Sequence, residues 1–558
     1  MVFLIPKNDF ELRLLSSLAK VFPGKAPPAR HEKEWLSALR GETVSFQMAY
    51  RINGPFRSWA KLTTDAPGLQ ITMRRVRYIQ GSIPSSYRTD DGYLTTAPGL
   101  FPDLLEPFDP GRLPLIPGSW QSIWIDIVAP PGAKAGGYPI TVRVETPDGV
   151  TLGSAGTTLE VIAAELPAQS IAHTEWFHSD CLAAYYGVDV FSERYWEIVE
   201  HFVSYAVRHG INMLLTPIHT PPLDTEVGGE RLTVQLIDVS AENGRYTFGF
   251  DKLARWVEMC GKAGVEYLEI AHLFSQWGAR YAPKVMGTRN GVYTRLFGWE
   301  DEATGPAYTG YLKQMLPELT AKLTEWGYAD KTFFHISDEP DLAHFDQYAA
   351  ARASVKPLLE GFKIIDALSD YEFYKRGAVP IPVPAVDHIE PFIEGGVPEL
   401  WCYYCCGQSY MVPNRFFMLP SFRNRILGTL LFKYNIAGFL QWGYNFYSCV
   451  HSVYPINPFG VTDADGTFPS GDAFIVYPGP EGYPLGSLRL MVMNEALNDL
   501  RAFRLLESLA GRDFALAMID GGLSKPVGFS RFPQNEEYLL SLRLRVNAEI
   551  AARISALT

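Results

Sequence analysis

The sequence predicts a multidomain protein of α and β structure, with an N-terminal β-sandwich over residues 1–168 and a (β/α)8 TIM-type barrel with C-terminal helices over residues 169–558. Two observations predict this division. Short segments of alternating hydrophobic and polar residues, separated by turn-forming residues, fill the first part of the chain. From about residue 170 onward, apolar runs alternate instead with stretches of helical periodicity, as in βα units.

The expected sandwich strands are segments in which apolar and polar residues alternate. They lie at residues 43–52, 69–78, 121–128, 138–144 and 158–162. Proline- and glycine-rich turns separate them. The long segment 82–117, rich in Pro, Asp and Tyr, is expected to be a surface loop, and a reach over the second domain is the alternative.

Eight apolar runs of strand length follow, at residues 173–179, 212–218, 267–274, 332–337, 363–368, 385–389, 399–405 and 438–444. Helices are expected between and after them, at residues 192–209, 251–263, 307–326, 341–359, 371–375, 415–434, 487–509 and 536–558. Eight βα repeats match a closed barrel. A doubly wound open sheet is the alternative, but no glycine-rich phosphate loop follows any of the strands.

Charge and hydropathy exclude several classes of partner. The formal net charge of −12 argues against nucleic acid or an anionic membrane surface. No run of ~18 apolar residues predicts a membrane span, and the first residues lack the basic region of a signal peptide.

The six cysteines predict a reduced protein. Three of them, Cys402, Cys405 and Cys406, lie in or directly after one expected strand, which argues against a disulfide framework and favours a cytoplasmic location. Their spacing suggests a metal site only weakly, because no second Cys/His pair stands at ligand spacing. No metal or cofactor is expected, and a homo-oligomer is left open.

Residues 331–340 (KTFFHISDEP) carry the strongest functional signal. Two adjacent carboxylates, Asp338 and Glu339, directly follow an apolar run and precede Pro340. Burying such charges is costly unless they are used, and the carboxyl ends of barrel strands form the floor of the active site. We therefore expect Asp338 and Glu339 to be catalytic. His335, inside the strand, is expected to be a hydrogen-bonded core residue.

The other expected strand ends carry aromatic, amide and histidine side chains, without a cluster of Arg or Lys. This pattern fits a neutral sugar better than a phosphate, so a glycan or glycoside is the expected partner. Gln276 and Trp277 stand near the end of the third strand. The expected substrate-binding residues are His219, His272, Trp401, Tyr403, Tyr404, Trp442 and Asn445.

Two mechanisms fit the carboxylate pair. A retaining glycosidase uses an acid and a separate nucleophile ~5–5.5 Å apart, for which Asp366, Asp387 and Glu390 are candidates. Alternatively, the acetamido oxygen of a 2-acetamido sugar attacks its own anomeric carbon. The protein then supplies one general acid, here Glu339, and one carboxylate that holds the acetamido N–H, here Asp338. This division requires the pKa of the acid to be raised and that of its neighbour to be lowered.

The chain resembles the glycoside hydrolase family 123 β-N-acetylgalactosaminidases and related uncharacterised glycosidase-like proteins. The resemblance covers most of the chain and rests on GETVSFQ (41–47), QSIWIDIVAPPGAKAGGY (121–138), HISDEP (335–340), GFLQWGYN (438–445), GDAFIVYPG (471–479) and SLRLMVMNEALNDLRAFRLL (487–506). It implies retaining, substrate-assisted hydrolysis without a metal or organic cofactor. The family's Asp-Glu pair maps onto Asp338 and Glu339, and the positions of Tyr403, Tyr404 and Trp442 suit an acetamido pocket.

We therefore expect an exo-acting β-N-acetylhexosaminidase that prefers GalNAc. One alternative is a glycosidase for a non-acetamido sugar with a separate carboxylate nucleophile, and another is a non-catalytic carbohydrate-binding protein. The cysteine-rich stretch WCYYCCGQ (401–408) departs from the family pattern.

Overall fold

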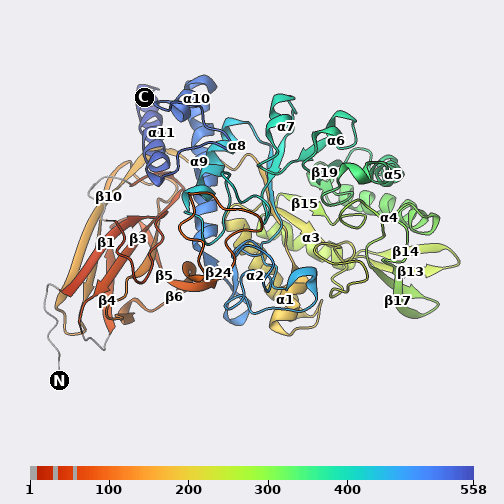
Figure 1. Ribbon diagram of the computed structural model, residues 1–558, viewed down its shortest axis with the longest axis horizontal. Coiled ribbons are helices and arrows are strands. Elements are labelled where there is room, and N and C mark those ends of the chain that lie inside the picture. The colour runs from red at the N-terminus through yellow and green to blue at the C-terminus, as the bar shows by residue number, and fades with distance from the viewer. Residues whose placement is uncertain (1–8, 29–35, 55–58, 558) are drawn as a thin grey trace.

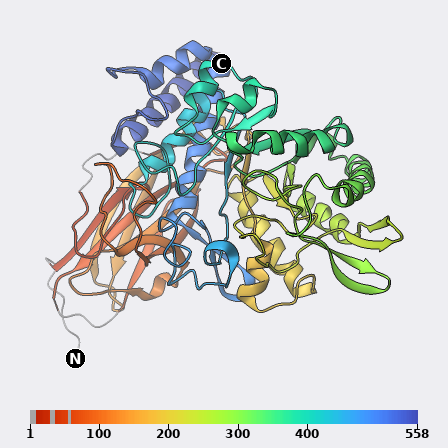
Figure 2. The ribbon, with the colours of Figure 1, turned by 45° about the vertical axis from the view of Figure 1, so that its right-hand side comes forward.

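The computed structural model describes residues 9–28, 36–54 and 59–557 of the chain. A β-rich N-terminal part lies at one side and a ring of parallel strands with its helices at the other (Figure 1). Helix α9 (Leu488–Ala510) lies between the two parts, as both ribbon views show (Figure 1 and Figure 2).

The N-terminal part contains two mostly antiparallel sheets that enclose one apolar core. The larger has the order β1–β3–β8–β5–β6–β24–β23 and the smaller the order β2–β10–β9–β4–β7. The strands are β1 (Phe10–Ser16), β2 (Leu36–Arg40), β3 (Thr43–Ile52), β4 (Trp59–Asp65), β5 (Gln70–Gly81), β6 (Gly99–Pro107), β7 (Leu113–Pro114), β8 (Gln121–Val128), β9 (Gly136–Glu145), β10 (Thr151–Glu165), β23 (Tyr477–Pro478) and β24 (Pro484–Ser487).

Strand β8 is buried on both faces. Ile123 and Ile125 belong to the core between the two sheets, whereas Trp124 belongs to the large core that continues into the barrel. The polar residue on the second face, Asp126, accepts hydrogen bonds from Ser45 Oγ (2.7 Å) and Trp124 Nε1 (2.6 Å). These bonds compensate for its burial.

The larger sheet takes strands from both halves of the chain. Strand β24 pairs with β6, with Gly486 opposite Leu105. Next to this pairing, the guanidinium of Arg489 in α9 donates to both carboxylate oxygens of Asp103 in β6, each at 2.9 Å. The domain boundary at residue 168 stays a prediction, because the sheet is built from segments on both sides of it.

The expectation of a surface loop over residues 82–117 is wrong. Its second half contains β6, and its first half reaches over the barrel. There Tyr93 Oη donates to the carbonyl of Ser409 (2.8 Å), and the guanidinium of Arg88 lies over the ring of Tyr410 at 3.8 Å. Asp90 accepts from Arg423 at 2.8 Å. Polar and aromatic residues thus anchor the segment to the barrel, as the alternative had it.

The second part is built on eight parallel strands in a nearly closed ring. The order is β20–β19–β18–β15–β12–β11–β22–β21. A single bridge between Ala385 and Tyr403 spans the remaining gap. The strands are β11 (Ala172–Glu175), β12 (Met213–Thr216), β15 (Tyr267–Ile270), β18 (Thr332–Phe334), β19 (Lys363–Ala367), β20 (Ile381–Val383), β21 (Trp401–Tyr403) and β22 (Gly438–Gln441).

The sixth strand lies four residues before its expected position at 385–389. Strand β20 pairs with β19, with Pro382 opposite Asp366. Proline lacks an N–H, so Pro382 and the adjoining Pro384 cannot donate to a neighbouring strand. This shortens the strand and explains why the ring is weakest between β20 and β21.

Helices lie between the strands and after the last one. They are α1 (Ser179–Tyr186), α2 (Glu193–Arg208), α3 (Asp251–Ala263), α4 (Pro306–Glu325), α5 (Phe345–Val355), α6 (Tyr371–Lys375), α7 (Glu390–Glu394), α8 (Phe422–Lys433), α10 (Arg512–Asp520) and α11 (Glu536–Leu557). Helix α11 contacts β10 and α9 and lies beside the sandwich (Figure 1).

A four-stranded sheet that the sequence analysis did not predict projects from the barrel, on the side away from the sandwich (Figure 1). It consists of β13 (Asp238–Glu242), β14 (Arg245–Gly249), β16 (Val285–Arg289) and β17 (Val292–Phe297). Asn243-Gly244 and Asn290-Gly291 form its two hairpin turns, with positive φ at all four residues. Such Asn-Gly pairs are the preferred residues of two-residue hairpin turns.

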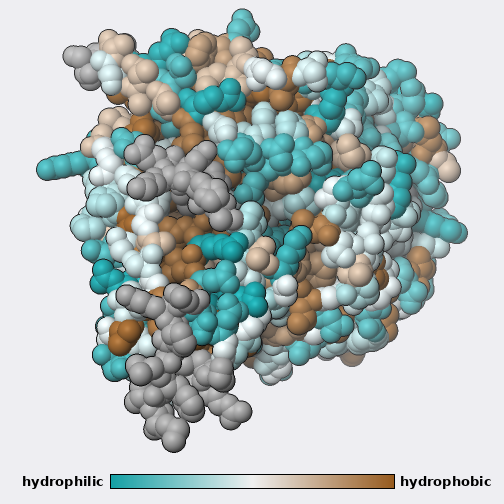
Figure 3. Space-filling model, turned by 60° about the vertical axis from the view of Figure 1, so that its left-hand side comes forward, coloured by the Kyte–Doolittle hydropathy of each residue, from teal (hydrophilic) through white to brown (hydrophobic). Residues whose placement is uncertain are grey.

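Among the residues that the structure describes, no helix is long and apolar enough to cross a membrane. The face with the sandwich side forward shows hydrophobic residues in separate patches between hydrophilic ones (Figure 3). All six cysteines are free thiols.

Candidate active site

A cavity opens at the carboxyl ends of the barrel strands. Its lining combines three carboxyl groups with several aromatic rings and two thiols. The lining residues are Trp176, Leu223, Asp224, Gln276, Trp277, Asp338, Glu339, Ala367, Tyr403, Cys405, Cys406, Leu440, Trp442 and Phe468.

The backbone around the two adjacent carboxylates is fixed from both sides. The carbonyl of Asp338 accepts from the N–H of Trp277 at 2.7 Å, and the N–H of Glu339 donates to the carbonyl of Ala367 at 3.0 Å. Glu339 has a φ of 43°. This left-handed conformation costs a side-chain-bearing residue about 1–3 kcal/mol and is typical of functional sites.

Both carboxyls of the pair are poor acids. Asp338 is half-buried and Glu339 is exposed to the cavity, but protein surrounds both carboxyls on their other sides. Burial, together with the charge of Glu339, raises the pKa of Asp338 well above its usual value. Burial also raises the pKa of Glu339, against the effect of a hydrogen bond from Tyr403 Oη to Glu339 Oε1 (2.5 Å).

The pKa values were expected to move in opposite directions, and this expectation is wrong: both are raised. Two carboxyls this close cannot both ionise readily, so the pair tends to share one proton. The Tyr403 hydrogen bond favours the charged form of Glu339, whereas the charge of Glu339 disfavours the charged form of Asp338.

A buried array of charged groups lies behind the pair. His335 Nε2 lies 2.7 Å from Glu269 Oε1, and His335 Nδ1 lies 3.4 Å from Asp366 Oδ1. Burial opposes protonation of the imidazole, but the hydrogen bonds to Asp366 and Glu269 outweigh it and raise the pKa of His335 to about 9. His335 is therefore an imidazolium at neutral pH, and it is a hydrogen-bonded core residue, as expected.

The two carboxylates of this array connect it to the cavity. Glu269 Oε1 also accepts from Trp176 Nε1 (2.8 Å), and Trp176 lines the cavity. Asp366 Oδ1 accepts from the N–H of Ile336 (2.8 Å), two residues before Asp338. The array therefore fixes one wall of the cavity and the backbone that leads to the carboxylate pair.

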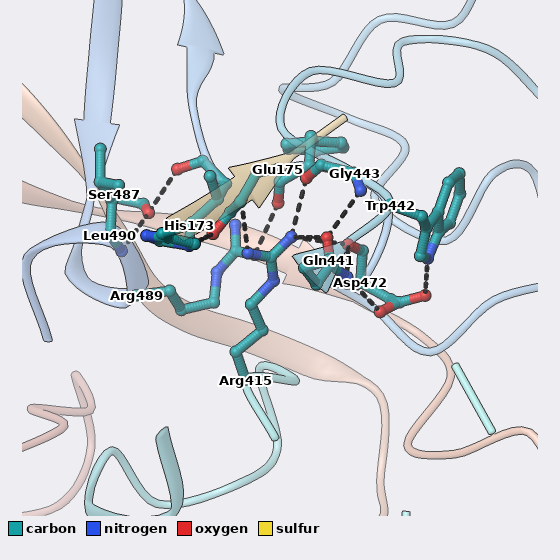
Figure 4. Close-up of polar contacts among 12 residues, drawn as sticks. His173, Glu175, Arg415, Gln441, Trp442, Gly443, Asp472, Ser487, Arg489 and Leu490 are labelled. Carbon is teal, nitrogen blue, oxygen red and sulfur yellow. Dashed lines mark hydrogen bonds and ion pairs between the residues drawn. The ribbon is translucent and has the colours of Figure 1, made fainter. Parts of the chain in front are cut away.

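A second buried network supports Trp442, which also lines the cavity. Arg415 donates to Glu175 Oε2 (2.7 Å) and to the carbonyl of Gly443 (2.7 Å). Asp472 Oδ2 accepts from Trp442 Nε1 (2.9 Å). Figure 4 shows these side chains converging on the loop after β22. Burial raises the pKa of Asp472 to about 6.

The structure brings four of the nine expected site residues together. Asp338, Glu339, Tyr403 and Trp442 line the cavity. The other five, which are fully or almost fully buried, are absent from its lining: His219, His272, Trp401, Tyr404 and Asn445.

These five residues contact other protein groups, through hydrogen bonds or apolar packing, and so contribute to the structure around the cavity. His219 Nε2 lies 2.7 Å from the carbonyl of His272, and Tyr404 Oη donates to Asn424 (3.0 Å). Trp401 belongs to the apolar core inside the ring, and the side chain of Asn445 hydrogen-bonds the backbone of His178. Their assignment as substrate contacts stays a prediction.

Several lining residues were missed or were not selected from the sequence. Trp176 lies inside the predicted strand 173–179 and was not selected. Asp224 and Phe468 lie in long loops, where no periodicity points to the cavity. Gln276 and Trp277 stand near the end of the third predicted strand, and both line the cavity.

Two groups of residues have metal-ligand chemistry. In the described part of the chain, ligand atoms of His272, His335 and Asp366 lie within 4.8 Å of one another. The carboxylates of Glu269 and Asp366 already face the two nitrogens of His335, so the group fits an internal ion pair. Cys402 is buried away from the cavity that Cys405 and Cys406 line, so the three cysteines do not form one ligand set.

A second, shallower hollow shares residues with the cavity. Glu339 and Tyr403 line both spaces, whereas Asp338 lines only the first. The wall of the second hollow also contains the polar residues Ser369, Asp370 and His388. Glu339 therefore stands between two adjoining spaces.

A carboxyl pair in a cavity at the strand ends of a parallel barrel suits glycoside cleavage, which commonly uses two carboxyl groups. The family model for glycoside hydrolase 123, catalytic domain, matches residues 176–506. The chain belongs to glycoside hydrolase family 123, which confirms the resemblance seen in the sequence.

One solved structure shares the fold over nearly its whole length. A family 123 glycoside hydrolase from Clostridium perfringens, described in a study of glycolipid glycan hydrolysis, aligns with a TM-score of 0.74 at 15% identity, over 98% of each chain. A Parabacteroides merdae β-glucuronidase aligns with a TM-score of 0.28 at 11% identity, over 84% of this chain and 51% of that one. The latter likeness is too weak to carry an argument. A search of curated proteins finds no match.

Proposed function

We propose that this family 123 glycosidase is an exo-acting β-N-acetylhexosaminidase that prefers GalNAc and works by retaining, substrate-assisted catalysis. In this proposal the ring of eight strands is the (β/α)8 barrel predicted from the sequence. The terminal sugar occupies the cavity, and the acetamido oxygen attacks the anomeric carbon.

The observation that carries the proposal is the place of Glu339 between the two hollows. A general acid has to reach the glycosidic oxygen, which joins the terminal sugar to the leaving alcohol. Glu339 faces both the cavity for that sugar and the second hollow, where the leaving alcohol would lie. Asp338 faces the sugar cavity alone, which suits a carboxylate that holds the acetamido N–H.

The shared proton explains how two weakly acidic carboxyls take different roles. In the free protein the Tyr403 hydrogen bond favours ionised Glu339. When an acetamido N–H binds Asp338, it stabilises the carboxylate there, and the proton moves to Glu339. Substrate binding thus produces the protonated acid that cleavage needs, and the same group later acts as a base toward water.

A second candidate, a glycosidase with a protein nucleophile, is favoured by one observation. Asp224 lines the same cavity as Asp338 and Glu339, although the sequence analysis did not consider it. The three nucleophiles suggested earlier do not line the cavity: Asp366 is bonded within the buried array, Asp387 accepts from Gln408, and Glu390 accepts from Ser530.

The test compares hydrolysis of the 4-nitrophenyl glycosides of β-GalNAc, β-GlcNAc and β-galactose. The proposal predicts cleavage of both acetamido sugars, fastest for GalNAc. Faster cleavage of the galactoside would contradict it. Covalent labelling of Asp224 by a 2-fluoro sugar would instead establish the second candidate.

A further inference from the structure

Two adjacent thiols form part of the cavity wall. Cys405 and Cys406 both line the cavity and are partly exposed, whereas Cys181, Cys260 and Cys402 are buried. The Sγ atoms of Cys405 and Cys406 lie 4.0 Å apart. A small reagent that enters the substrate cavity therefore meets two thiols within reach of each other.

Contacts around the pair hold Cys405 in place. Its thiol donates to Gln408 Oε1 at 3.3 Å, and its N–H donates to the same oxygen at 2.9 Å. The Nε2 of Gln408 donates in turn to Asp387 Oδ1 at 3.1 Å. The contact with Cys406 and burial raise the pKa of Cys405 well above its usual value, so Cys405 is held as the protonated thiol.

We propose that Cys405 and Cys406 are a redox modification site that a hydroperoxide converts to a disulfide, and that this conversion impairs sugar binding in the cavity. The consequence for binding rests on the proposed function, whereas formation of the disulfide does not. Nothing in the hydrolytic reaction uses either sulfur, so the site is a separate property of the cavity wall.

The reaction balances with hydrogen peroxide as the oxidant. The sulfur of Cys406 attacks one peroxide oxygen, the O–O bond breaks, and the leaving hydroxide takes the proton of the Cys406 thiol and departs as water. The resulting sulfenic acid is attacked by the sulfur of Cys405, the S–O bond breaks, and a second water leaves with the Cys405 proton. The two thiols lose two electrons and two protons, and peroxide is reduced to two waters.

The short separation of the two cysteines makes their disulfide easy to reduce, and forming it changes the cavity wall. Adjacent Cα atoms are about 3.8 Å apart, below the ~4.4–6.8 Å that unstrained disulfides prefer, so the bond is readily reduced. Closing the Sγ–Sγ distance from 4.0 Å to about 2.05 Å moves both sulfurs and disturbs the contact with Gln408. The wall beside Tyr403 then changes shape.

The test treats the full chain with hydrogen peroxide and follows two readouts. Mass spectrometry with iodoacetamide labelling detects the disulfide, and hydrolysis of 4-nitrophenyl β-GalNAc reports on the cavity. We expect both thiols to become resistant to labelling and activity to fall roughly 10- to 100-fold, with recovery after dithiothreitol. For each variant, the hydrolysis rate after oxidation is divided by the rate before oxidation. A difference in starting activity between variants therefore does not affect the comparison.

Variants separate this site from general oxidation. Cys405→Ser and Cys406→Ser should lose the reversible inhibition, whereas Cys260→Ala, which alters a buried thiol outside the cavity, should keep it. Absence of a Cys405–Cys406 disulfide, a disulfide without change in hydrolysis, or equal inhibition of the double serine variant would each overturn the proposal. If no glycoside is hydrolysed even before oxidation, the proposed function fails, and the labelling experiment still tests the disulfide.

Discussion

Tyr403 Oη donates a 2.5 Å hydrogen bond to Oε1 of Glu339, and the two side chains together form the boundary between the two hollows. The bond joins the end of β21 to the loop after β18, across the barrel mouth. It stabilises the carboxylate form of Glu339 and thereby opposes the effect of burial on the pKa of this group.

Replacing Tyr403 by Phe removes this bond and should raise the pKa of Glu339. A hydrogen bond to a charged group contributes about 1.5–3 kcal/mol, which corresponds to roughly one to two pH units. Because the protonated acid then persists to higher pH, the alkaline limb of the kcat/KM profile should shift upward. An unchanged profile would show that the bond does not control this titration. Tyr410→Phe, at a tyrosine outside the cavity, is the control.

Replacing Glu339 by Gln removes the proposed proton donor. General acid catalysis contributes about 10²–10⁴-fold, so hydrolysis of an unactivated oligosaccharide should fall by that order. An aryl glycoside with a good leaving group needs little protonation and should lose far less. Comparing the two substrates in steady-state assays checks this, with Glu390→Gln as the matched control. If the variant loses the same factor in hydrolysis rate on both substrates, Glu339 is not the general acid.

The buried array predicts a pH dependence of stability. The pKa of His335 is raised from 6.5 to about 9, so its contribution is fully present below pH 6.5 and is lost as pH rises through 9. The contribution is of the order of 3 kcal/mol. Thermal unfolding should therefore show a steeper decline in stability over this range in the natural protein than in His335→Gln. His388→Gln, at an exposed histidine, should retain the steep decline.

The barrel was predictable because its strands are short apolar runs that alternate along the chain with helical stretches. The exception, β20, lies in a proline-rich apolar stretch, where hydropathy alone gives no register. The small sheet of β13, β14, β16 and β17 was missed because these short strands lack a continuous apolar pattern. The two Asn-Gly pairs, at residues 243–244 and 290–291, were the signal that would have revealed its hairpins.

The site was predictable where the chain itself places residues together, as with Asp338 and Glu339. Tyr403 and Trp442 were found because they stand at strand ends. Asp224 comes from a loop whose path depends on tertiary contacts, among them a hydrogen bond from the N–H of His451 to Asp224 Oδ2 (3.0 Å). No local pattern in the sequence encodes such a contact.

The central claim is that the acetamido oxygen of the substrate is the nucleophile, and one kinetic series tests it most directly. The series uses aryl β-GalNAc substrates whose acetyl group carries zero, one, two or three fluorine atoms, because each fluorine makes the carbonyl oxygen less nucleophilic. The account predicts that kcat/KM falls steeply with every added fluorine. A rate that stays level across the series would contradict it.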